Sequence, residues 1–320
     1  MPNKTPTISF IIPIYNESQN IEWHHKKIVA ELHKLPTDYE LVYVDDGSID
    51  NSLDLLKEFA KHDKRVKFLS FSRNFGKEIA LSAGLSACIG DAAIMLDADG
   101  QHPIELIGQF IDKWKSGYKV VTGVRKSNQK EGMVKRWGSR IYYKIFNSIA
   151  SSKSVPGATD FRLLDRQVID EFGKLPEKNR LTRNLIDWLG FSTAYIDFHS
   201  PPRLYGVAAY SPRKLVALAI NGFVSHTMLP LRISAYVGMF ITFMSFLIGL
   251  ALFIEMFPLG DPLHLSISGT AFLALFLTFL VGIVLVCQGL LALYIENIHV
   301  ETQQRPLFVV EETNIKPTNK

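Results

Sequence analysis

The sequence predicts an α/β protein with a ligand site at one edge of a parallel sheet, followed by two membrane-spanning helices. Between residues 7 and 125, short apolar runs typical of buried strands alternate with helical stretches. Charged residues follow these runs directly. Two long apolar stretches, 231–257 and 267–293, come later, and each exceeds the about 20 apolar residues that one bilayer crossing needs.

Composition supports this division of the chain. A hydrophobic content of 47% over 320 residues is high for a soluble globular protein and favours lipid-facing segments. The net charge of +4 is too small to indicate nucleic-acid binding. Cys88 and Cys287 stand apart, so we expect neither a disulfide framework nor a thiolate metal site. The polar start, 1–7, shows no cleavable signal.

The elements of the first domain follow one another at the spacing of a doubly wound parallel sheet. Each predicted strand is apolar, and Pro13 is expected to break the first one. Pro36 ends the first helix. The predicted strands are 7–17, 40–44, 66–71, 92–96 and 120–125, and the predicted helices are 20–35, 50–59 and 78–88.

The stretch around Asp97 and Asp99 is the centre of the predicted site. These two carboxylates, one residue apart, end an apolar strand just before Gly100 and Pro103. Such oxygen ligands suit Mg²⁺ or Mn²⁺ carrying a substrate's phosphates. Taken alone, a solvated turn explains the pattern equally well.

Four strand ends together favour a functional site over four unrelated loops. In a parallel sheet these ends meet at one edge, where open α/β sheets bind ligands. Carboxylates and cations mixed there predict a site for a charged ligand and a metal ion. No Gly-rich dinucleotide or Walker motif is present. The pairs are Asn16/Glu17, Asp45/Asp46, Arg73/Lys77 and Asp97/Asp99.

The segment 134–150 combines Lys and Arg residues with aromatic and aliphatic ones and predicts a basic amphipathic helix on an anionic membrane surface. A helix packed on its own domain with a solvated basic face is the alternative. Asp160 and Arg162 then lie close together in a short apolar run after a turn. A purely structural ion pair is the alternative for them.

The remaining chain predicts a membrane anchor. A juxtamembrane helix, 212–230, is flanked by basic residues and precedes the spans 231–257 and 267–293, with a re-entrant pair as the alternative. The loop between the spans has no Lys or Arg, so the positive-inside rule places the domain 1–211, the tail 294–320 and both termini in the cytoplasm.

The ordered motifs resemble the membrane-bound polyisoprenyl-phosphate glycosyltransferases of glycosyltransferase family 2. The resemblance is closest to bactoprenol glucosyltransferases and extends to dolichyl-phosphate mannose synthases over the catalytic domain. It implies a GT-A nucleotide-sugar-binding fold. The motifs are Ile11–Glu17, Val44–Ser48, Ser72–Lys77, Asp97–Pro103, Asp160–Leu163 and Arg305–Leu307.

The resemblance also implies roles for individual residues, and His102 is interpreted as a loop residue. Nucleotide-sugar binding would fall to Pro13, Tyr15, Glu17, Asp45, Asp46, Arg73, Lys77 and Asp97. The catalytic residues would be Asp97, Asp99, Asp160 and Arg162, and the metal ligands Asp97, Asp99 and Gln101. Acceptor phosphate would meet Arg162, Arg203, Arg213 and Lys214.

One departure concerns the acceptor side. Where the family commonly has Gly-x-Ser-Lys or Gly-x-Thr-Lys before an aromatic residue, this chain has Gly206 to Tyr210 with Ala208 and Ala209 in the middle. The hydroxyl and the ammonium are missing. Arg203, Arg213 or Lys214 would have to substitute for that lysine, or the acceptor geometry differs, or activity is reduced.

The resulting hypothesis is inverting transfer of a hexose from a nucleotide sugar to undecaprenyl phosphate, assisted by Mg²⁺ or Mn²⁺, at the bacterial cytoplasmic membrane. By resemblance, UDP-glucose is the leading donor and a tetramer the expected assembly. Asp160 as a general base is not required, because the acceptor is already anionic. Alternatives are a mannose or N-acetylhexosamine synthase, a processive polysaccharide synthase, for which the Gln-x-x-Arg-Trp motif is missing, and a non-catalytic membrane scaffold.

Overall fold

The computed structural model describes residues 6–126, 155–178, 180–200 and 269–315, with single positions at 240, 243, 247 and 254. By its internal contacts the chain forms two compact units, 1–209 with 305–320 and 210–304. The predicted helices 134–150 and 212–230 lie outside the described residues, as do Arg203, Arg213 and Lys214.

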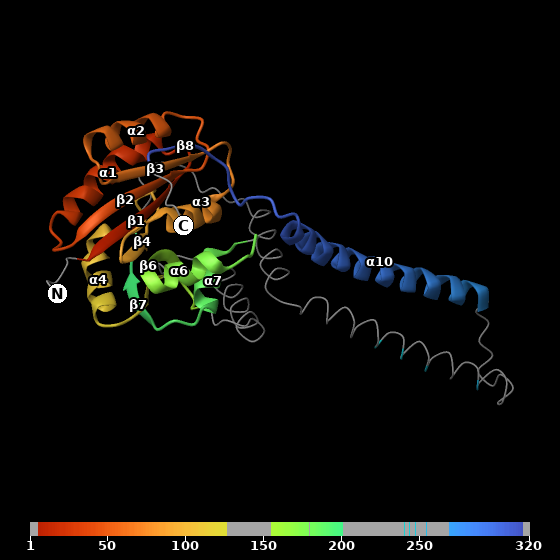
Figure 1. Ribbon diagram of the computed structural model, residues 1–320. Coiled ribbons are helices and arrows are strands. Elements are labelled where there is room, and N and C mark those ends of the chain that lie inside the picture. Colours follow the sequence, from red (N-terminus) through yellow and green to blue (C-terminus); the bar gives the residue numbers. More distant parts are fainter. Residues whose placement is uncertain are drawn as a thin grey trace. The chain divides into compact units, whose positions relative to one another are not determined.

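In the first unit, the described strands form one eight-stranded sheet in the order β7-β5-β6-β4-β1-β2-β3-β8. Helices α1, α2 and α4 pack on one face of this sheet, and α3, α6 and α7 pack on the other (Figure 1). The strands are β1 (Thr7–Ile14), β2 (Asp38–Asp45), β3 (Val66–Phe71), β4 (Ala92–Met95), β5 (Val120–Arg125), β6 (Ala158–Asp165), β7 (Thr193–Phe198) and β8 (Val310–Thr313). The helices are α1 (Ser18–Leu32), α2 (Ser52–His62), α3 (Lys77–Ala87), the short 3₁₀ turn η1 (Ile104–Leu106), α4 (Ile107–Lys115), α6 (Arg166–Lys174) and α7 (Thr182–Trp188).

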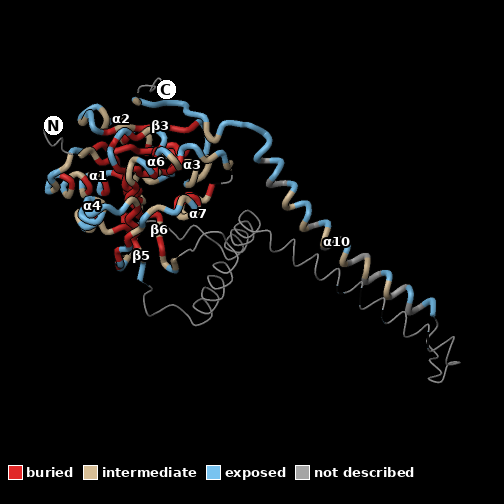
Figure 2. Tube along the Cα trace, turned by 60° about the horizontal axis from the view of Figure 1, so that its bottom comes forward, coloured by how far each residue is buried: buried red, intermediate tan, exposed pale blue. Residues whose placement is uncertain are grey.

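The layers follow from the two-residue period of the strands. In β1, Phe10 and Ile12 face the helices α1 and α4, whereas Ile11 faces α3. All three are buried. A strand covered on both faces must be apolar throughout, which explains why its sequence shows no polar alternation. Figure 2 shows the buried positions concentrated in the strands, with the exposed ones on the outer faces of the helices.

The parallel arrangement predicted from the sequence is found for β3, β2, β1 and β4. On the other side of the sheet it is wrong for β6 alone, which pairs antiparallel with both β4 and β5, whereas β5 and β7 pair parallel. An antiparallel strand needs no helical crossover before it, so the strand and helix alternation could not reveal it. The consequence is functional: Arg162 on β6 lies in register with Met95, the last residue of β4.

Pro13 does not break the first strand. It pairs in register with Val44 of β2 near the end of β1. The adjacent Ile14 carbonyl accepts the Asp46 N–H, so the backbone polar groups of Ile14 point toward β2, and those of Pro13 point toward the opposite neighbour, β4. Pairing with β4 has already ended at Ile11. The missing N–H of Pro13 therefore removes no hydrogen bond from the ladder.

The segment that follows helix α10 (Gly269–Thr302) joins the sheet as β8, antiparallel to β3. Asn314 holds the end of this strand, accepting the Phe68 N–H at 2.8 Å and donating to the Val66 carbonyl at 3.0 Å. Phe308 stacks on Phe71 with ring centroids 5.0 Å apart. The predicted tail 294–320 thus contributes a strand to the first unit.

The second unit contains α10 (Gly269–Thr302), which takes in most of the predicted span 267–293. The predicted span 231–257 lies outside the described residues except at four positions. Among the residues that the structure describes, no helix has the length and the apolar character required to cross a bilayer. This finding overturns the prediction of an integral protein of the bacterial cytoplasmic membrane.

Candidate active site

The loop after β4 holds the predicted metal-binding residues in a fixed turn. The Asp97 N–H donates to His102 Nδ1 at 3.0 Å, and the Gln101 N–H donates to Asp99 Oδ1 at 3.0 Å. Gly100 turns the chain with a φ of 72°. His102 is buried and stacks on Phe161 with ring centroids 5.0 Å apart, and burial lowers its pKa. The Nδ1 atom of His102 thus already accepts a hydrogen bond within the loop.

Four charged side chains form an ionic chain at this loop, in the order Asp97, Lys77, Asp160, Arg183. Lys77 Nζ lies 2.7 Å from Asp97 Oδ1 and 3.1 Å from Asp160 Oδ2. Arg183 Nη2 donates to the same Asp160 oxygen at 3.2 Å. It also lies 3.1 Å from Asp160 Oδ1, but without the angle of a hydrogen bond, and that buried oxygen has no hydrogen-bond partner in the described structure.

The ionic chain keeps all its members charged. Burial would raise the pKa of Asp160, but Lys77 and Arg183 outweigh burial and hold it well below its ordinary value. Burial likewise acts to raise the pKa of Asp97, and Lys77 again outweighs it. For Lys77, burial acts to lower the pKa, and the two carboxylates together raise it above its ordinary value.

Arg162, predicted to be catalytic and to bind acceptor phosphate, is directed into the protein. Its side chain is 1% exposed. Nη1 lies 2.6 Å from Asp187 Oδ1 and 3.4 Å from the Arg183 carbonyl oxygen. Nε donates to the Thr159 carbonyl at 3.1 Å. The structure therefore brings Arg162 against α7, through Asp187 and the Arg183 carbonyl, in the interior of the protein.

Sequence reasoning missed the contribution of α7. Arg183 and Asp187 are four residues apart and so lie on the same side of this helix. Glu78 at the start of α3 accepts the Thr182 N–H at 2.8 Å. Burial, and then the charge of Asp160, raises the pKa of Glu78. The charged i, i+4 pair Arg183 and Asp187, among the apolar residues of 181–189, was the available signal.

The predicted donor-side residues occupy the adjacent strand ends. Asp45 accepts the Ser48 N–H at 3.1 Å and the Ser70 hydroxyl at 2.7 Å. Asp46 is also buried and accepts the N–H groups of Phe75 and Gly76 at 2.7 and 2.9 Å. Burial raises the pKa of Asp46, although these N–H groups act against it. Both carboxylates thus shape the loops around the site.

The first strand end is held just as closely. Tyr15 after β1 is 46% exposed and presents an aromatic face at this edge. The next residue, Asn16, has a φ of 53°, and its side chain accepts the Ile49 N–H at 2.9 Å. Glu17 accepts from the Asn20 side chain at 2.5 Å. Arg73 of the third strand end lies over the Phe75 ring, 4.1 Å from its centroid.

The loops after β2 and β3 are packed tightly enough to require glycine at position 47. Gly47 has a φ of +68°, which strains any other residue. A Cβ at this position would lie 2.4 Å from the Arg73 carbonyl carbon. Gly47 thus lets the Asp46 turn approach the backbone of the Arg73 loop.

The carboxylates of the site fit a hard divalent ion. Within the described part of the chain, no cluster of three His, Cys, Asp or Glu side chains could hold a metal by itself. Asp97 and Asp99 supply two oxygen ligands, and the ammonium of Lys77 already lies in contact with the first. Mg²⁺ and Mn²⁺ sites commonly use one or two carboxylates and complete their coordination with water and substrate phosphates. This set is adequate for such a site.

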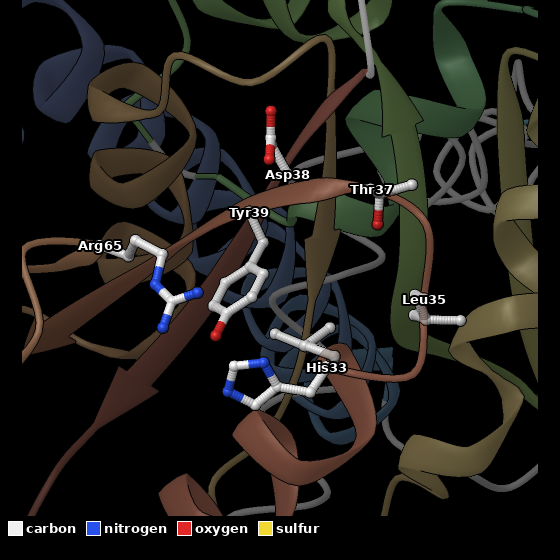
Figure 3. A pocket seen from close by; sticks show the side chains of 7 residues that line it. His33, Leu35, Thr37, Asp38, Tyr39 and Arg65 are labelled. Atoms are coloured by element: carbon white, nitrogen blue, oxygen red, sulfur yellow. The ribbon is translucent and has the colours of Figure 1, made fainter.

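A separate hollow of about 360 Å³ lies at the other end of β2, where the strand begins at Asp38. It is lined in part by Tyr39 and Arg65, as Figure 3 shows. The Arg65 guanidinium lies over the Tyr39 ring and pairs with Asp63 at 2.8 Å. Its charge is thus already balanced, and the hollow is not part of the ionic chain.

Comparison with solved structures defines the fold class. Mannosyl-3-phosphoglycerate synthase from Rubrobacter xylanophilus superposes with a TM-score of 0.50, covering 67% of this chain and 70% of that one at 18% sequence identity. At this identity the likeness concerns the fold alone. It is the GT-A-like α/β fold expected from the sequence motifs.

The chain belongs to glycosyl transferase family 2, whose family model matches residues 9–173. Its relatives include an uncharacterised glycosyltransferase of Synechocystis sp., 35% identical and covering 96% of both chains. A prophage-derived bactoprenol glucosyl transferase of Shigella flexneri is 34% identical and covers 96% of this chain and 98% of its own. The predicted family membership is confirmed, and the protein is a glycosyltransferase.

Proposed function

We propose that the protein transfers glucose from a nucleotide sugar, UDP-glucose in the first instance, to a polyisoprenyl phosphate with inversion at the anomeric carbon. The observation that carries this proposal is the ionic chain Asp97, Lys77, Asp160, Arg183, which places the cation of Lys77 in contact with the predicted metal ligand Asp97 and the cation of Arg183 on the next carboxylate, Asp160. Relatives named bactoprenol glucosyl transferase match nearly the full length and support the choice of sugar and lipid.

In the proposed reaction an oxygen of the acceptor phosphate forms a bond to the anomeric carbon. The bond from that carbon to the diphosphate breaks, and its electron pair leaves with the nucleoside diphosphate. A divalent ion held by Asp97, Asp99 and Gln101 would supply Lewis-acid stabilisation of the departing diphosphate. Lys77, which contacts Asp97, would add positive charge on the same side.

No proton has to be removed from the acceptor, because a phosphate monoester is already anionic near neutral pH. The lowered pKa of Asp160 makes it a weak base. We therefore assign Asp160 an orienting role: its carboxylate holds Lys77 and Arg183 in place from one position. Alignment of the two substrates then supplies much of the rate enhancement.

The donor side would use the strand ends described above. Tyr15, which is exposed, is suited to contact the base. Arg73 would line the diphosphate together with Lys77. The roles of Pro13, Glu17, Asp45 and Asp46 in holding base and ribose stay predictions, as does the tetramer.

The test is transfer of radiolabelled sugar to undecaprenyl phosphate in detergent, with UDP-glucose, GDP-mannose and UDP-N-acetylglucosamine compared side by side. We expect labelled lipid from UDP-glucose that depends on Mg²⁺ or Mn²⁺. Labelling from another donor would replace the sugar, and none from any donor with folded protein would favour a non-catalytic protein.

The metal role has its own readout. Asp99→Ala should weaken Mn²⁺ binding in the presence of UDP, as followed by electron paramagnetic resonance, at least about 10-fold, since one of two carboxylate ligands is lost. Asp170→Ala is the matched control, because Asp170 is a half-exposed carboxylate on α6. Equal Mn²⁺ affinity in the two variants would remove Asp99 from the metal site.

A further inference from the structure

The loop 72–76, which follows β3 at the edge of the site, is held from two sides. On one side the Asp46 carboxylate accepts the N–H groups of Phe75 and Gly76 at 2.7 and 2.9 Å. On the other side lies the segment 305–309, which comes from the far end of the chain and lies between α10 and β8. We call it the connecting segment. The proposed function has so far given it no role.

The connecting segment is bonded through its backbone at both ends. The Ser72 N–H donates to the Val309 carbonyl at 3.1 Å, one residue before β8 begins. Four residues earlier, the Arg305 carbonyl accepts from Lys178 Nζ at 2.8 Å. These two bonds fix the segment against the loop after β3, so its side chains keep a defined position there.

Three aromatic rings connect this segment to Arg73. Phe308 stacks on Phe71 with ring centroids 5.0 Å apart and an interplanar angle of 21°. Phe71 also meets Phe75 edge to face, with centroids 5.6 Å apart. The Arg73 guanidinium in turn lies 4.1 Å from the centroid of the Phe75 ring. Phe71 is buried, whereas Phe308 and Phe75 are half-buried, so the outer two rings hold their places by packing on the same inner ring.

Arg73 is the residue that this arrangement holds in place. It is exposed, and its Nη1 donates to the Asn74 carbonyl at 3.2 Å. An exposed arginine loses rotamer freedom when it binds an anion, and a ring that already holds the guanidinium lowers this cost. The donors of a guanidinium lie in its plane, so a ring against its face does not use them. We therefore expect the packing of the rings to raise the affinity of Arg73 for a diphosphate.

We infer that Phe308 is a positioning residue for the donor diphosphate and that it acts through the aromatic rings on Arg73. This inference rests on the proposed function for the role of Arg73 toward the diphosphate. It also makes the C-terminal part of the chain a component of the donor site, because the pairing of β8 with β3 holds the connecting segment beside the loop.

The first experiment measures equilibrium binding of UDP to the full chain in the presence of Mn²⁺, with GDP in parallel. Phe308→Ala should weaken binding of the preferred nucleotide about 3- to 10-fold, the size of one aromatic contact. Phe308→Tyr keeps the ring and should bind within about 2-fold of the wild type. Binding of the matching nucleoside, which has no diphosphate, should change less than about 2-fold in Phe308→Ala.

A double-variant cycle separates a positioning role from a general loss of stability. Arg73→Gln alone should weaken nucleotide binding about 10- to 100-fold, the usual effect of losing a charged hydrogen bond. In that background Phe308→Ala should change the affinity less than about 2-fold, because the group through which it acts is gone. Ile315→Ala truncates another apolar side chain packed on the same core and should match the wild type. An equal effect of Phe308→Ala with and without Arg73 would overturn the inference.

The second experiment does not need a nucleotide. Hydrogen–deuterium exchange over the loop 72–76 should be faster in Phe308→Ala than in the wild type or in Ile315→Ala, because the Ser72 N–H is bonded to the connecting segment. Unchanged exchange there would overturn the inference and leave the proposed function intact. Failure of the folded wild type to bind either nucleotide would overturn the proposed function, and exchange of the loop would still decide whether Phe308 positions it.

Discussion

The buried ion pair between Arg162 and Asp187 gives the sharpest prediction about how the site is held. Asp187→Ala removes the counter-ion of a guanidinium that is 1% exposed, while the carboxylate itself is 19% exposed. Leaving one member of a buried pair unpaired costs about 3–5 kcal/mol. Because Asp187 keeps some contact with water, we expect the lower end, about 3 kcal/mol, in the free energy of unfolding.

The assay is urea unfolding of the full chain followed by tryptophan fluorescence, to which Trp188 on α7 contributes. Asp187→Asn keeps one acceptor oxygen and should lose about half as much. The double variant Arg162→Met with Asp187→Leu removes both charges and should recover most of the loss, because an apolar pair can replace a buried ion pair.

The control is Asp170→Ala, which breaks an exposed pair with Arg166 at 3.6 Å and should cost no more than about 0.5 kcal/mol. If Asp187→Ala is no more destabilising than this control, the pair does not anchor α7. A double variant that is less stable than Asp187→Ala alone would refute the electrostatic explanation and point to packing instead.

Two further predictions concern the turn at position 47 and the pH dependence. Gly47→Ala should lower the free energy of unfolding in urea by at least about 2 kcal/mol, because the φ of Gly47 is +68° and an added Cβ would meet the Arg73 backbone. Gly173→Ala is the control and should not destabilise, because an added Cβ there meets open space. Equal effects of the two changes would contradict the packing argument. The pKa of Asp160 is lowered, so its stabilising charge is present above about pH 4 and lost as the pH falls further. We expect transfer to rise with pH near 6, where the acceptor phosphate loses its second proton, and to stay level to about pH 9. Asp160→Asn should slow transfer without moving the pH midpoint of this rise. A midpoint shifted by about one pH unit would instead make Asp160 the titrating base.

Much of the site could be predicted because parallel strands place their carboxyl ends at one edge. Asp97 and Asp160 are far apart in sequence, yet each carries charge at the end of or within an apolar run, and the structure joins them through Lys77. The sequence could not indicate which of two nearby arginines faces solvent. Arg162 and Arg183 have the same chemistry, and only the fold directs the first inward and the second outward.

The pattern also failed where pairing partners are distant in sequence. The antiparallel β6 and the edge strand β8 depend on contacts across tens to hundreds of residues, such as Asn314 with Phe68. The local periodicity of a sequence does not indicate such contacts. The predicted membrane spans rest on the composition of apolar runs alone. The span 231–257 lies outside the described residues except at four positions, and among the described residues no helix combines the length and the apolar character that a bilayer crossing needs.

The sequence by itself determined the family, the alternation of strands and helices, and the carboxylates at the strand ends, because these depend on residue type and spacing along the chain. The tertiary structure decided which charges become neighbours. Asp160 acquires its lowered pKa only because α3 brings Lys77 and α7 brings Arg183 to the same carboxylate. Electrostatic energy depends on distance and burial, and both are set by the packing of elements that are remote in the sequence.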